Sequence, residues 1–218
     1  MSGNMQLGQI NLLDALASAD LLRTFKRRQI ERKTIIFTPF EQSNSVFIIK
    51  SGRLRVFLSY DDKEFTLAFL EAGDVFSTHT RAYVQAVEET EILLTPTSAF
   101  QATIESLPGV SLVMAKVLGD LLKNSITTIE GLAFKDVRRR IADFLVQTFE
   151  ERGEESPAGV VVKLGLSTED IALLIGTTRQ TISLILNDLI KEEIIEKPNR
   201  RTLIVRDLAA LLAWRDSL

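Results

Sequence analysis

The chain has 218 residues, 45% of them hydrophobic and 25% charged, which suits one large domain or two modest ones with an ordinary apolar core. Its net charge of −3 gives no global sign of nucleic-acid binding, so any DNA-binding surface has to be local. Cysteine is absent, which excludes disulfides, thiolate nucleophiles and cysteine-ligated iron–sulfur clusters, and the single histidine, His79, argues against a protein-only zinc site. With no signal-peptide pattern and no membrane-spanning apolar run, we expect a cytoplasmic protein.

The first thirty residues alternate short apolar runs with polar ones. The stretch LLDALASADLLRTFKRRQ, residues 12–29, has apolar residues at helical spacing. It therefore predicts one or two short helices at the start of the chain.

Between residues 33 and 96 the period changes to that of strands. Short segments rich in β-branched and aromatic residues are separated by the turn signals NS, SG, DDKE, EAG and EET, and they read TIIFTP, SVFIIK, RLRVFLSY, FTLAFL, YVQAV and EILLTP. No long helix interrupts them, which argues against a parallel doubly wound sheet. The pattern predicts an antiparallel sandwich, barrel or roll.

From residue 98 the pattern is helical. SAFQATIESL predicts a short helix that ends before Pro108, and the next 25 residues, VSLVMAKVLGDLLKNSITTIEGLAF, predict a long one. Residues at alternating steps of three and four form a heptad seam: Ala115, Leu118, Leu122, Ser125, Ile129 and Leu132. The seam could pack on its own domain, but its length favours a homodimer.

A second domain is expected after the long helix. Asp136 is a plausible N-cap for VRRRIADFLVQTFEER, because its carboxylate can accept from the free amides of the next turn. We therefore expect a β-roll domain over residues 1–108, a dimerisation helix over 109–134 and a second domain over 135–218, whose winged helix-turn-helix is described next. The overall class is α+β.

The strongest motif lies in residues 166–197, LSTEDIALLIGTTRQTISLILNDLIKEEIIEK, which predicts helix, turn, helix. Ser167 can cap the first helix, and Gly176 allows a left-handed end to it. Thr177 and Gln180 are expected to form a Thr-x-x-Gln capping box for the second helix. The buried stripe of that helix is expected to consist of Ile182, Ile185, Leu186 and Leu189.

The opposite face of the second helix predicts DNA recognition, since arginine pairs with guanine, glutamine can pair with adenine and serine is adaptable. Its candidate DNA-binding residues are Thr178, Arg179, Gln180 and Ser183. The segment KPNRRTLIVRD then predicts a two-stranded wing whose cations contact phosphates, namely Lys197, Arg200 and Arg201. A polar, solvated face is the alternative, and the run Arg138, Arg139 and Arg140 is open to either interpretation.

A β-roll, a long dimer helix, a hinge and a winged helix-turn-helix together resemble the CRP/FNR family of bacterial transcription regulators. LAFKDVRRRIADFL is similar to the family's hinge, and IALLIGTTRQTISLILNDLIKEEII to its DNA-binding motif. The resemblance implies a cyclic-nucleotide-binding-like roll that senses a small effector, and long helices that carry the signal to the DNA domains. It also implies a double-stranded DNA operator, contact with RNA polymerase as an activator, and no enzymatic activity.

The effector is less clear from the family pattern. Cyclic-nucleotide-binding members carry Gly-Glu and, several residues later, Arg followed by Ser or Thr. Here residues 76–82 lack Gly-Glu, and Arg81 is followed by Ala82. A regulator of another small effector, such as an organic acid, a cyclic nucleotide or a different gas, stays open as an alternative. A hydrolase built on His79 is disfavoured, because no nucleophile–base pair is visible.

Four segments are similar to the haem-containing, carbon-monoxide-sensing branch of the family: SGRLRVFL, EFTLAFLEAGDVFSTHTRA, KVLGDLLKNSITTIEGLAFKD and LIGTTRQT. This resemblance implies a non-covalent haem b with His79 as an axial ligand. The other axial ligand would be the N-terminal amine of the partner subunit's Ser2, if Met1 is removed. Ser77 stands where the branch's type member has cysteine, so we expect no thiolate exchange on reduction.

The resemblance also implies how a signal would be produced. Carbon monoxide would displace the amine, and the long helices would shift against the haem. The distal side is expected to be lined by Ala115, Leu118, Gly119 and Leu122, where glycine permits a close approach of the backbone and apolar side chains favour an uncharged diatomic ligand. For Leu118 and Leu122 a coiled-coil role is compatible with this one.

Overall fold

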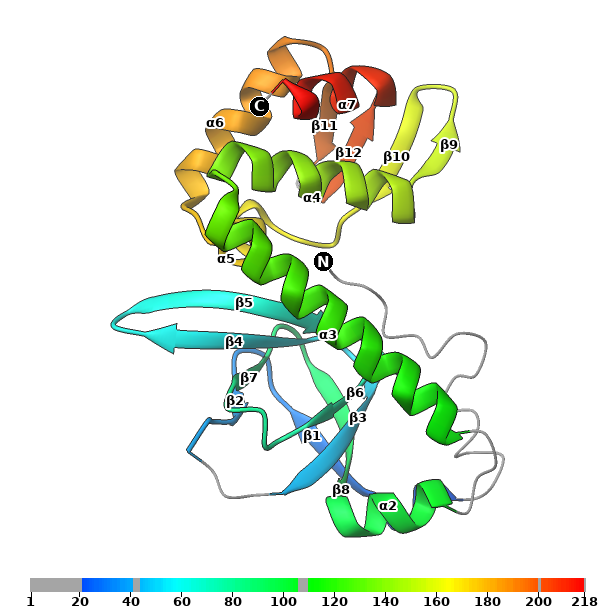
Figure 1. Cartoon of the computed structure of the whole chain (residues 1–218). Helices are drawn as coiled ribbons and strands as arrows, with labels where there is room; N and C mark the ends of the chain where they lie inside the picture. The colour runs from blue at the N-terminus through cyan, green and yellow to red at the C-terminus, as the bar shows by residue number, and fades with distance from the viewer. Residues whose placement is uncertain (1–20, 41–43, 106–109, 200, 218) are drawn as a thin grey trace. The chain divides into compact units, whose positions relative to one another are not determined.

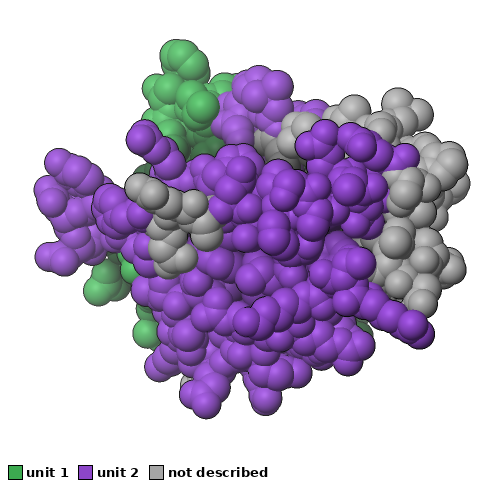
Figure 2. Space-filling view, turned by 90° about the horizontal axis from the view of Figure 1, so that it is seen from below, with its two compact units in different colours: residues 1, 64–66, 127–218 green, residues 2–63, 67–126 purple. Residues whose placement is uncertain are grey.

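The structure, a computed structural model, describes residues 21–40, 44–105, 110–199 and 201–217 (Figure 1). The chain divides into two compact units, which are coloured separately in Figure 2. One comprises residues 2–63 and 67–126, and the other comprises residues 1, 64–66 and 127–218. Within the described residues, no helix is long and apolar enough to cross a membrane.

The first unit is built mainly from antiparallel strands. They form two four-stranded sheets, ordered β1-β8-β3-β6 and β2-β7-β4-β5. The elements are η1 (Leu21–Thr24), β1 (Lys26–Ile30), β2 (Ile35–Phe37), β3 (Ser45–Ser51), β4 (Leu54–Tyr60), β5 (Lys63–Leu70), β6 (Val75–Ser77), β7 (Tyr83–Ala86), β8 (Thr90–Pro96) and α2 (Thr97–Glu105). The predicted antiparallel β-architecture is confirmed, and each of the six predicted segments contains a strand.

The core of this roll follows from alternation along the strands. Aromatic and β-branched side chains on the inner faces fill it, and Phe37 stacks on Phe47 with ring centroids 5.2 Å apart. The fully enclosed members include Phe47, Ile49, Leu54, Leu70 and Ile92. This packing holds the short strands in register, because a slip of one residue would turn each apolar side chain outward.

The prediction of helix over residues 26–29 is wrong. These residues belong to β1, which pairs with β8 from Lys26 opposite Leu94 to Ile30 opposite Thr90. Four of the five β1 side chains are exposed, and only Ile30 is buried. Hydrogen bonding to an available strand therefore outweighs the local helical pattern, which survives only in the single 3₁₀ turn of η1. Residues 12–20 lie outside the described part.

The long helix α3 (Val110–Phe134) is followed after two residues by a mixed α/β region. Its strands form one antiparallel sheet, ordered β11-β12-β10-β9. The elements are α4 (Val137–Arg152), β9 (Glu154–Ser156), β10 (Gly159–Lys163), α5 (Thr168–Ile175), α6 (Arg179–Lys191), β11 (Ile195–Asn199), β12 (Thr202–Val205) and α7 (Leu208–Asp216). This confirms the predicted C-terminal winged helix-turn-helix.

An apolar stripe runs along the described side chains of α3 and is exposed to solvent. Leu122, Ile126 and Ile129 are 62%, 56% and 65% exposed, and Leu132 continues the same spacing. Single exposed apolar residues are ordinary, but a stripe at helical spacing is the pattern of a seam that another helix covers. The stripe includes three positions of the predicted heptad and adds Ile126.

Candidate functional site

His79 lies in the turn that follows β6, and the turn is anchored to β3. Thr78, which is buried, donates its backbone N–H to the Ser45 carbonyl at 2.9 Å, and its Oγ1 accepts from the Ser45 N–H at 3.0 Å. Because Thr78 is held inward by these two bonds, its neighbours on either side are directed to the surface. His79 is exposed and Ser77 is half-buried.

The His79 ring is oriented by its neighbour. Its Nδ1 lies 2.5 Å from the Ser77 Oγ, and that hydroxyl reaches the Ser45 carbonyl at 3.4 Å. The hydroxyl's own hydrogen can go to the carbonyl, so the Ser77 Oγ can accept a hydrogen bond from Nδ1–H, which leaves the lone pair on Nε2. Among the residues that the structure describes, Nε2 has no hydrogen-bond partner.

This arrangement fits an axial ligand of a planar iron cofactor. An iron-binding imidazole commonly has its second ring nitrogen fixed by a hydrogen bond, which sets the tautomer and the ring's orientation. Across the described ranges, no group of three or more His, Cys, Asp and Glu residues is gathered to hold a metal ion. His79 could hold a metal-containing cofactor through its Nε2.

The neighbouring turn differs from a phosphate-binding cassette in its geometry as well as its sequence. Arg81 is exposed and has a left-handed backbone, with φ of 56°. Ala82, at the position where the cassette has Ser or Thr, is only 3% exposed and belongs to the roll's core. A hydroxyl at that position would face apolar side chains and not a ligand.

The other expected haem contacts are only partly described. Ser2 and the side chains of Ala115 and Leu118 lie outside the described residues. Gly119 is exposed, and a Cβ added to it would meet no atom within 4 Å, while Leu122 is exposed as well. In the single chain, the structure thus does not bring Gly119 against His79, and this face of α3 is open.

The helix-turn-helix is closed by its own residues. Ser167 caps α5 in a full capping box, accepting from the Asp170 N–H while the Asp170 carboxylate accepts from the Ser167 N–H. Gly176 ends the helix with φ of 74°, as predicted. The predicted Thr177–Gln180 box is wrong, because Thr178 is the N-cap of α6 and accepts from the Thr181 N–H at 3.2 Å.

Thr177 is excluded from that role by the preceding turn. Its N–H and that of Gly176 both donate to the Ala172 carbonyl, which completes the end of α5. Thr177 is therefore part of the first helix's termination, and the next residue begins the second. Because Thr177 and Thr178 are adjacent and either residue type can cap a helix, the sequence alone did not show which of them is the N-cap.

The two faces of α6 separate as predicted. Ile182, Ile185, Leu186 and Leu189 are buried, whereas Arg179 and Gln180 are exposed and Ser183 is half-buried. One large apolar side chain on the exposed face of α6 was not predicted from the sequence, namely Leu184, which is 62% exposed. It lies four residues after Gln180, so a helical wheel drawn from the sequence would have placed it on the polar face.

The wing is present, but one of its cations lies elsewhere. Arg201 is exposed between β11 and β12, and its N–H donates to the Asn199 Oδ1 at 2.9 Å, while Arg200 lies outside the described residues. Lys197 is not at the tip, because it lies within β11 and its Nζ donates to the Thr168 Oγ1 at 3.2 Å. Burial lowers the pKa of Lys197.

The arginine run at the start of α4 proves largely structural. The Arg140 guanidinium donates to three carbonyls, those of Lys135 at 2.8 Å, Ile175 at 3.0 Å and Gly176 at 3.4 Å. Arg139 donates to the Arg215 carbonyl at 2.7 Å. Only Arg138 is mainly exposed, with one weak ion pair to Asp188 at 3.9 Å.

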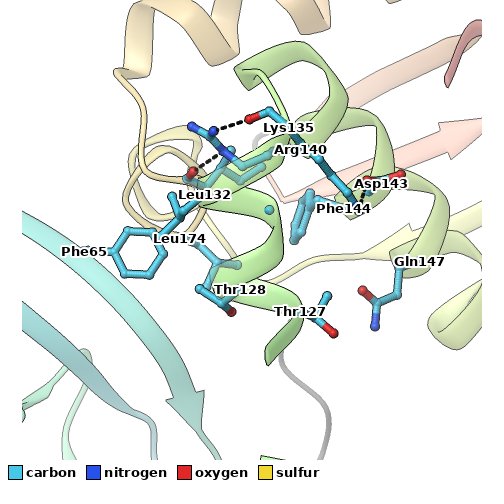
Figure 3. Close-up of a pocket in the computed structure, with 12 residues that line it drawn as sticks. Phe65, Thr127, Thr128, Leu132, Lys135, Arg140, Asp143, Phe144, Gln147 and Leu174 are labelled. Carbon is cyan, nitrogen blue, oxygen red and sulfur yellow. Dashed lines mark hydrogen bonds and ion pairs between the residues drawn. The ribbon is translucent and has the colours of Figure 1, made fainter. Parts of the chain in front are cut away.

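Arg140 lies beside a pocket of about 550 Å³, including the part open to solvent (Figure 3). All of its lining residues belong to the unit that contains residues 64–66 and 127–218. The Lys135 Nζ lies 3.1 Å from the Asp143 carboxylate, and the hydrogen bond that it donates to this carboxylate raises the pKa of Lys135. At one side of the pocket, the Arg140 guanidinium joins the segment after α3 to the end of α5 through its bonds to the carbonyls of Lys135, Ile175 and Gly176.

Comparison with known proteins agrees with both units. Residues 139–214 match a Crp-like helix-turn-helix domain, and residues 27–106 match a cyclic nucleotide-binding domain. Among curated proteins, the global nitrogen regulator of Synechococcus elongatus is 28% identical over 83% of this chain and 86% of its own.

Solved structures include nearer relatives. A double mutant of CooA from Carboxydothermus hydrogenoformans is 50% identical, covering 97% of this chain and 99% of that one, with a TM-score of 0.92. The reduced, ferrous carbon-monoxide-sensing protein from R. rubrum is 32% identical over 94% of this chain and 98% of that one, with a TM-score of 0.53.

Proposed function

This chain belongs to the CRP/FNR family of DNA-binding transcription regulators, and we propose that it is a haem-based sensor of carbon monoxide that acts as a transcription activator. It would work in the cytoplasm as a homodimer, bind a double-stranded operator and contact RNA polymerase. The family and the helix-turn-helix establish that the chain is a DNA-binding transcription regulator. The identity of its effector is what we propose.

One observation carries the haem assignment. The only histidine of a chain 50% identical to CooA over nearly its full length is exposed and oriented through Nδ1, and its Nε2 has no hydrogen-bond partner among the described residues. A hydrogen bond that fixes the ring of an exposed histidine contributes little to stability, but it orients the ring for a ligand. An imidazole held in this way is suited to bind a metal through its other ring nitrogen.

The chain's own residues would divide the work as follows. His79 would hold the iron through Nε2, and Ser77 would fix the tautomer by accepting from Nδ1–H. When bound, haem supplies the ferrous centre to which carbon monoxide coordinates. Because Ser77 cannot act as a thiolate, His79 would serve in both oxidation states, and the amine of the partner subunit's Ser2 would be the replaceable ligand.

The dimer is supported by the exposed stripe on α3. In a dimer, the same residues of a second copy would cover Leu122, Ile126 and Ile129. Removing this apolar surface from water would stabilise the dimer. The expected distal residues Ala115, Leu118, Gly119 and Leu122 precede or overlap this stripe. A shift of the paired helices would thus change the position of the residues on the distal side of the haem and of the hinge that follows α3.

A second candidate is a regulator of another effector. The match of residues 27–106 to a cyclic nucleotide-binding domain and the likeness to a nitrogen regulator favour it. Against a cyclic nucleotide stands the buried Ala82, which puts a core residue where a phosphate contact is needed. An organic acid or a different gas as the effector is distinguished from carbon monoxide by the absorbance experiment that follows.

Absorbance of the purified protein separates the two candidates. Added haem should give a Soret band that shifts when the reduced protein meets carbon monoxide, and His79→Ala should lose or alter that band. Thr80→Ser, which keeps the neighbouring hydroxyl that donates to the Ser77 carbonyl at 3.2 Å, is the matched control and should behave as wild type. A wild-type protein that takes up no haem would refute the proposal and leave the second candidate.

The role of Ser77 has its own spectroscopic test. Ser77→Ala should still bind haem, but the iron–imidazole stretching vibration of the ferrous protein should fall in frequency, because Nδ1–H loses its acceptor and the ring becomes a weaker donor to iron. Resonance Raman spectra of the two proteins measure this. An unchanged frequency would mean that Nδ1 has another acceptor in the haem-bound protein.

A further inference from the structure

The face of α6 that the helix-turn-helix offers to DNA contains one large apolar side chain. Leu184 is 62% exposed, whereas the next leucine of the same helix, Leu186, is 2% exposed. An exposed leucine is by itself ordinary. This one is distinguished by its position, because it lies one turn beyond Gln180 on the side opposite the buried stripe.

Helical geometry sets what Leu184 can reach. Residues four apart on a helix lie on the same face, roughly 6 Å apart along the axis, which corresponds to about two base-pair steps. Leu184 is the sixth residue of α6, within the two turns that enter a major groove in this type of motif. Asn187 continues the same exposed face one turn later.

The chemistry of the groove then identifies the partner. A leucine neither donates nor accepts a hydrogen bond, so it cannot read guanine, cytosine or adenine by their polar edges. Thymine alone offers an apolar group there, the C5-methyl. We propose that Leu184 is a specificity-determining residue, which selects thymine by contact with this methyl group about two base pairs from the base that Gln180 meets.

The proposal depends on the DNA-binding function of the family and not on haem. A leucine facing a polar base edge would leave that edge desolvated and unpaired, so the preference has a repulsive as well as an attractive part. Substitution should not disturb the fold, since the side chain is at the surface and the buried stripe is untouched.

The test begins with selection from a random duplex pool. The full-length protein is used both with haem and carbon monoxide and without them, and sites are recovered from each state. Wild type should enrich thymine at one position of each half-site, and Leu184→Ala should lose that preference alone. Leu184→Met, which keeps an apolar side chain of similar size, should retain it.

The methyl group is then removed from the DNA itself. Deoxyuridine in place of thymidine at the enriched position should weaken wild-type binding roughly fourfold, the ratio expected for one methyl group. Leu184→Ala should bind both duplexes equally, and uracil at neighbouring thymines should have no such effect. Equal sensitivity of the two proteins to the uracil would overturn the proposal, as would a selection in which no sequence is enriched.

A uniform loss has a different meaning. If Leu184→Ala weakens binding to every sequence by the same factor, Leu184 contributes shape or packing at the backbone and reads no base. That outcome also overturns the proposal, but it leaves the assignment of α6 as the DNA-reading helix intact. Thermal unfolding of the variants, unchanged from wild type, excludes a folding defect as its cause.

Discussion

The turn that bears His79 and the helix-turn-helix are completed in different ways. Both ends of α5 and the start of α6 are closed by nearby residues, namely Ser167, Asp170, Gly176 and Thr178. His79 is exposed, and among the residues that the structure describes only its Nδ1 has a hydrogen-bond partner, the Ser77 hydroxyl. The helix-turn-helix thus satisfies its own helix ends, whereas at His79 one ring nitrogen is left for the ligand that we propose.

The difference teaches where each function is encoded. A DNA-reading surface needs a rigid scaffold with a few side chains projecting from it, and local caps give that rigidity. The ligand site that we propose at His79 needs instead a ring nitrogen that the chain itself does not occupy. The following predictions challenge this contrast, in order of decreasing effect.

Arg140 is where the self-contained region is expected to be most vulnerable. Arg140→Ala would leave the carbonyls of Lys135, Ile175 and Gly176 without their charged donor, and each such bond is worth about 1.5–3 kcal/mol. We expect a loss of about 3 kcal/mol in the free energy of unfolding, measured by denaturant titration. Arg138→Ala is the control, since an exposed ion pair contributes under about 1 kcal/mol. Equal losses would show that helix propensity, not the carbonyl contacts, matters.

Haem should stabilise the open region instead. A ligand that binds only the folded protein adds about 2.7 kcal/mol when its concentration is a hundred times its dissociation constant. We expect unfolding of the wild type to shift accordingly with added haem, while His79→Ala shows little shift. Without haem the two proteins should have the same stability, because His79 is exposed. A variant that is less stable in the absence of haem would assign His79 a structural role.

The caps give the next effect and test the boundary of α6. Thr178→Ala should cost about 1 kcal/mol in the free energy of unfolding, since the Thr181 amide loses its acceptor. Thr177→Ala should change stability by no more than a few tenths, because only its backbone takes part in the turn. Thermal denaturation of the pair measures the difference. The reverse order would restore the capping box predicted from the sequence.

The smallest effect concerns Lys197. Burial holds its pKa below the ordinary value of 10.5, so the unfolded chain binds more protons than the folded one between that lowered pKa and 10.5. Stability should therefore rise with pH across this window as the penalty on the charged amine disappears. Lys197→Met should reduce the rise, which denaturant titrations at several alkaline pH values detect. An identical pH dependence in both proteins would mean that the amine is solvated.

Strand and helix positions were largely readable from the sequence where the period was strong. The six segments between residues 33 and 96, α3 and the helix-turn-helix were all anticipated. β1 was not, because its helical spacing is overruled by pairing with β8, which lies more than sixty residues away. β6 was missed because three residues carry no measurable period.

The candidate site divided in the same manner. Ser167, Gly176 and the buried stripe of α6 follow from local rules, and the sequence predicted them correctly. Lys197 was misplaced because its position depends on Thr168, in another element. Leu184 was not predicted, because only polar side chains were expected to contact base edges. Its spacing of four residues from Gln180 was nevertheless visible in the sequence.

By itself the sequence determined most of the elements, the caps at Ser167 and Gly176, the heptad spacing and the absence of thiol chemistry, since these depend on residue type and spacing over a few turns. Tertiary structure alone decided which surfaces are free and which groups are occupied. It turned Arg139 and Arg140 from candidate phosphate contacts into internal donors, moved Lys197 from the wing's tip and set Ser77 against the His79 ring. The physical reason is that hydrogen-bond satisfaction depends on distances between segments far apart in the chain, which no local pattern encodes.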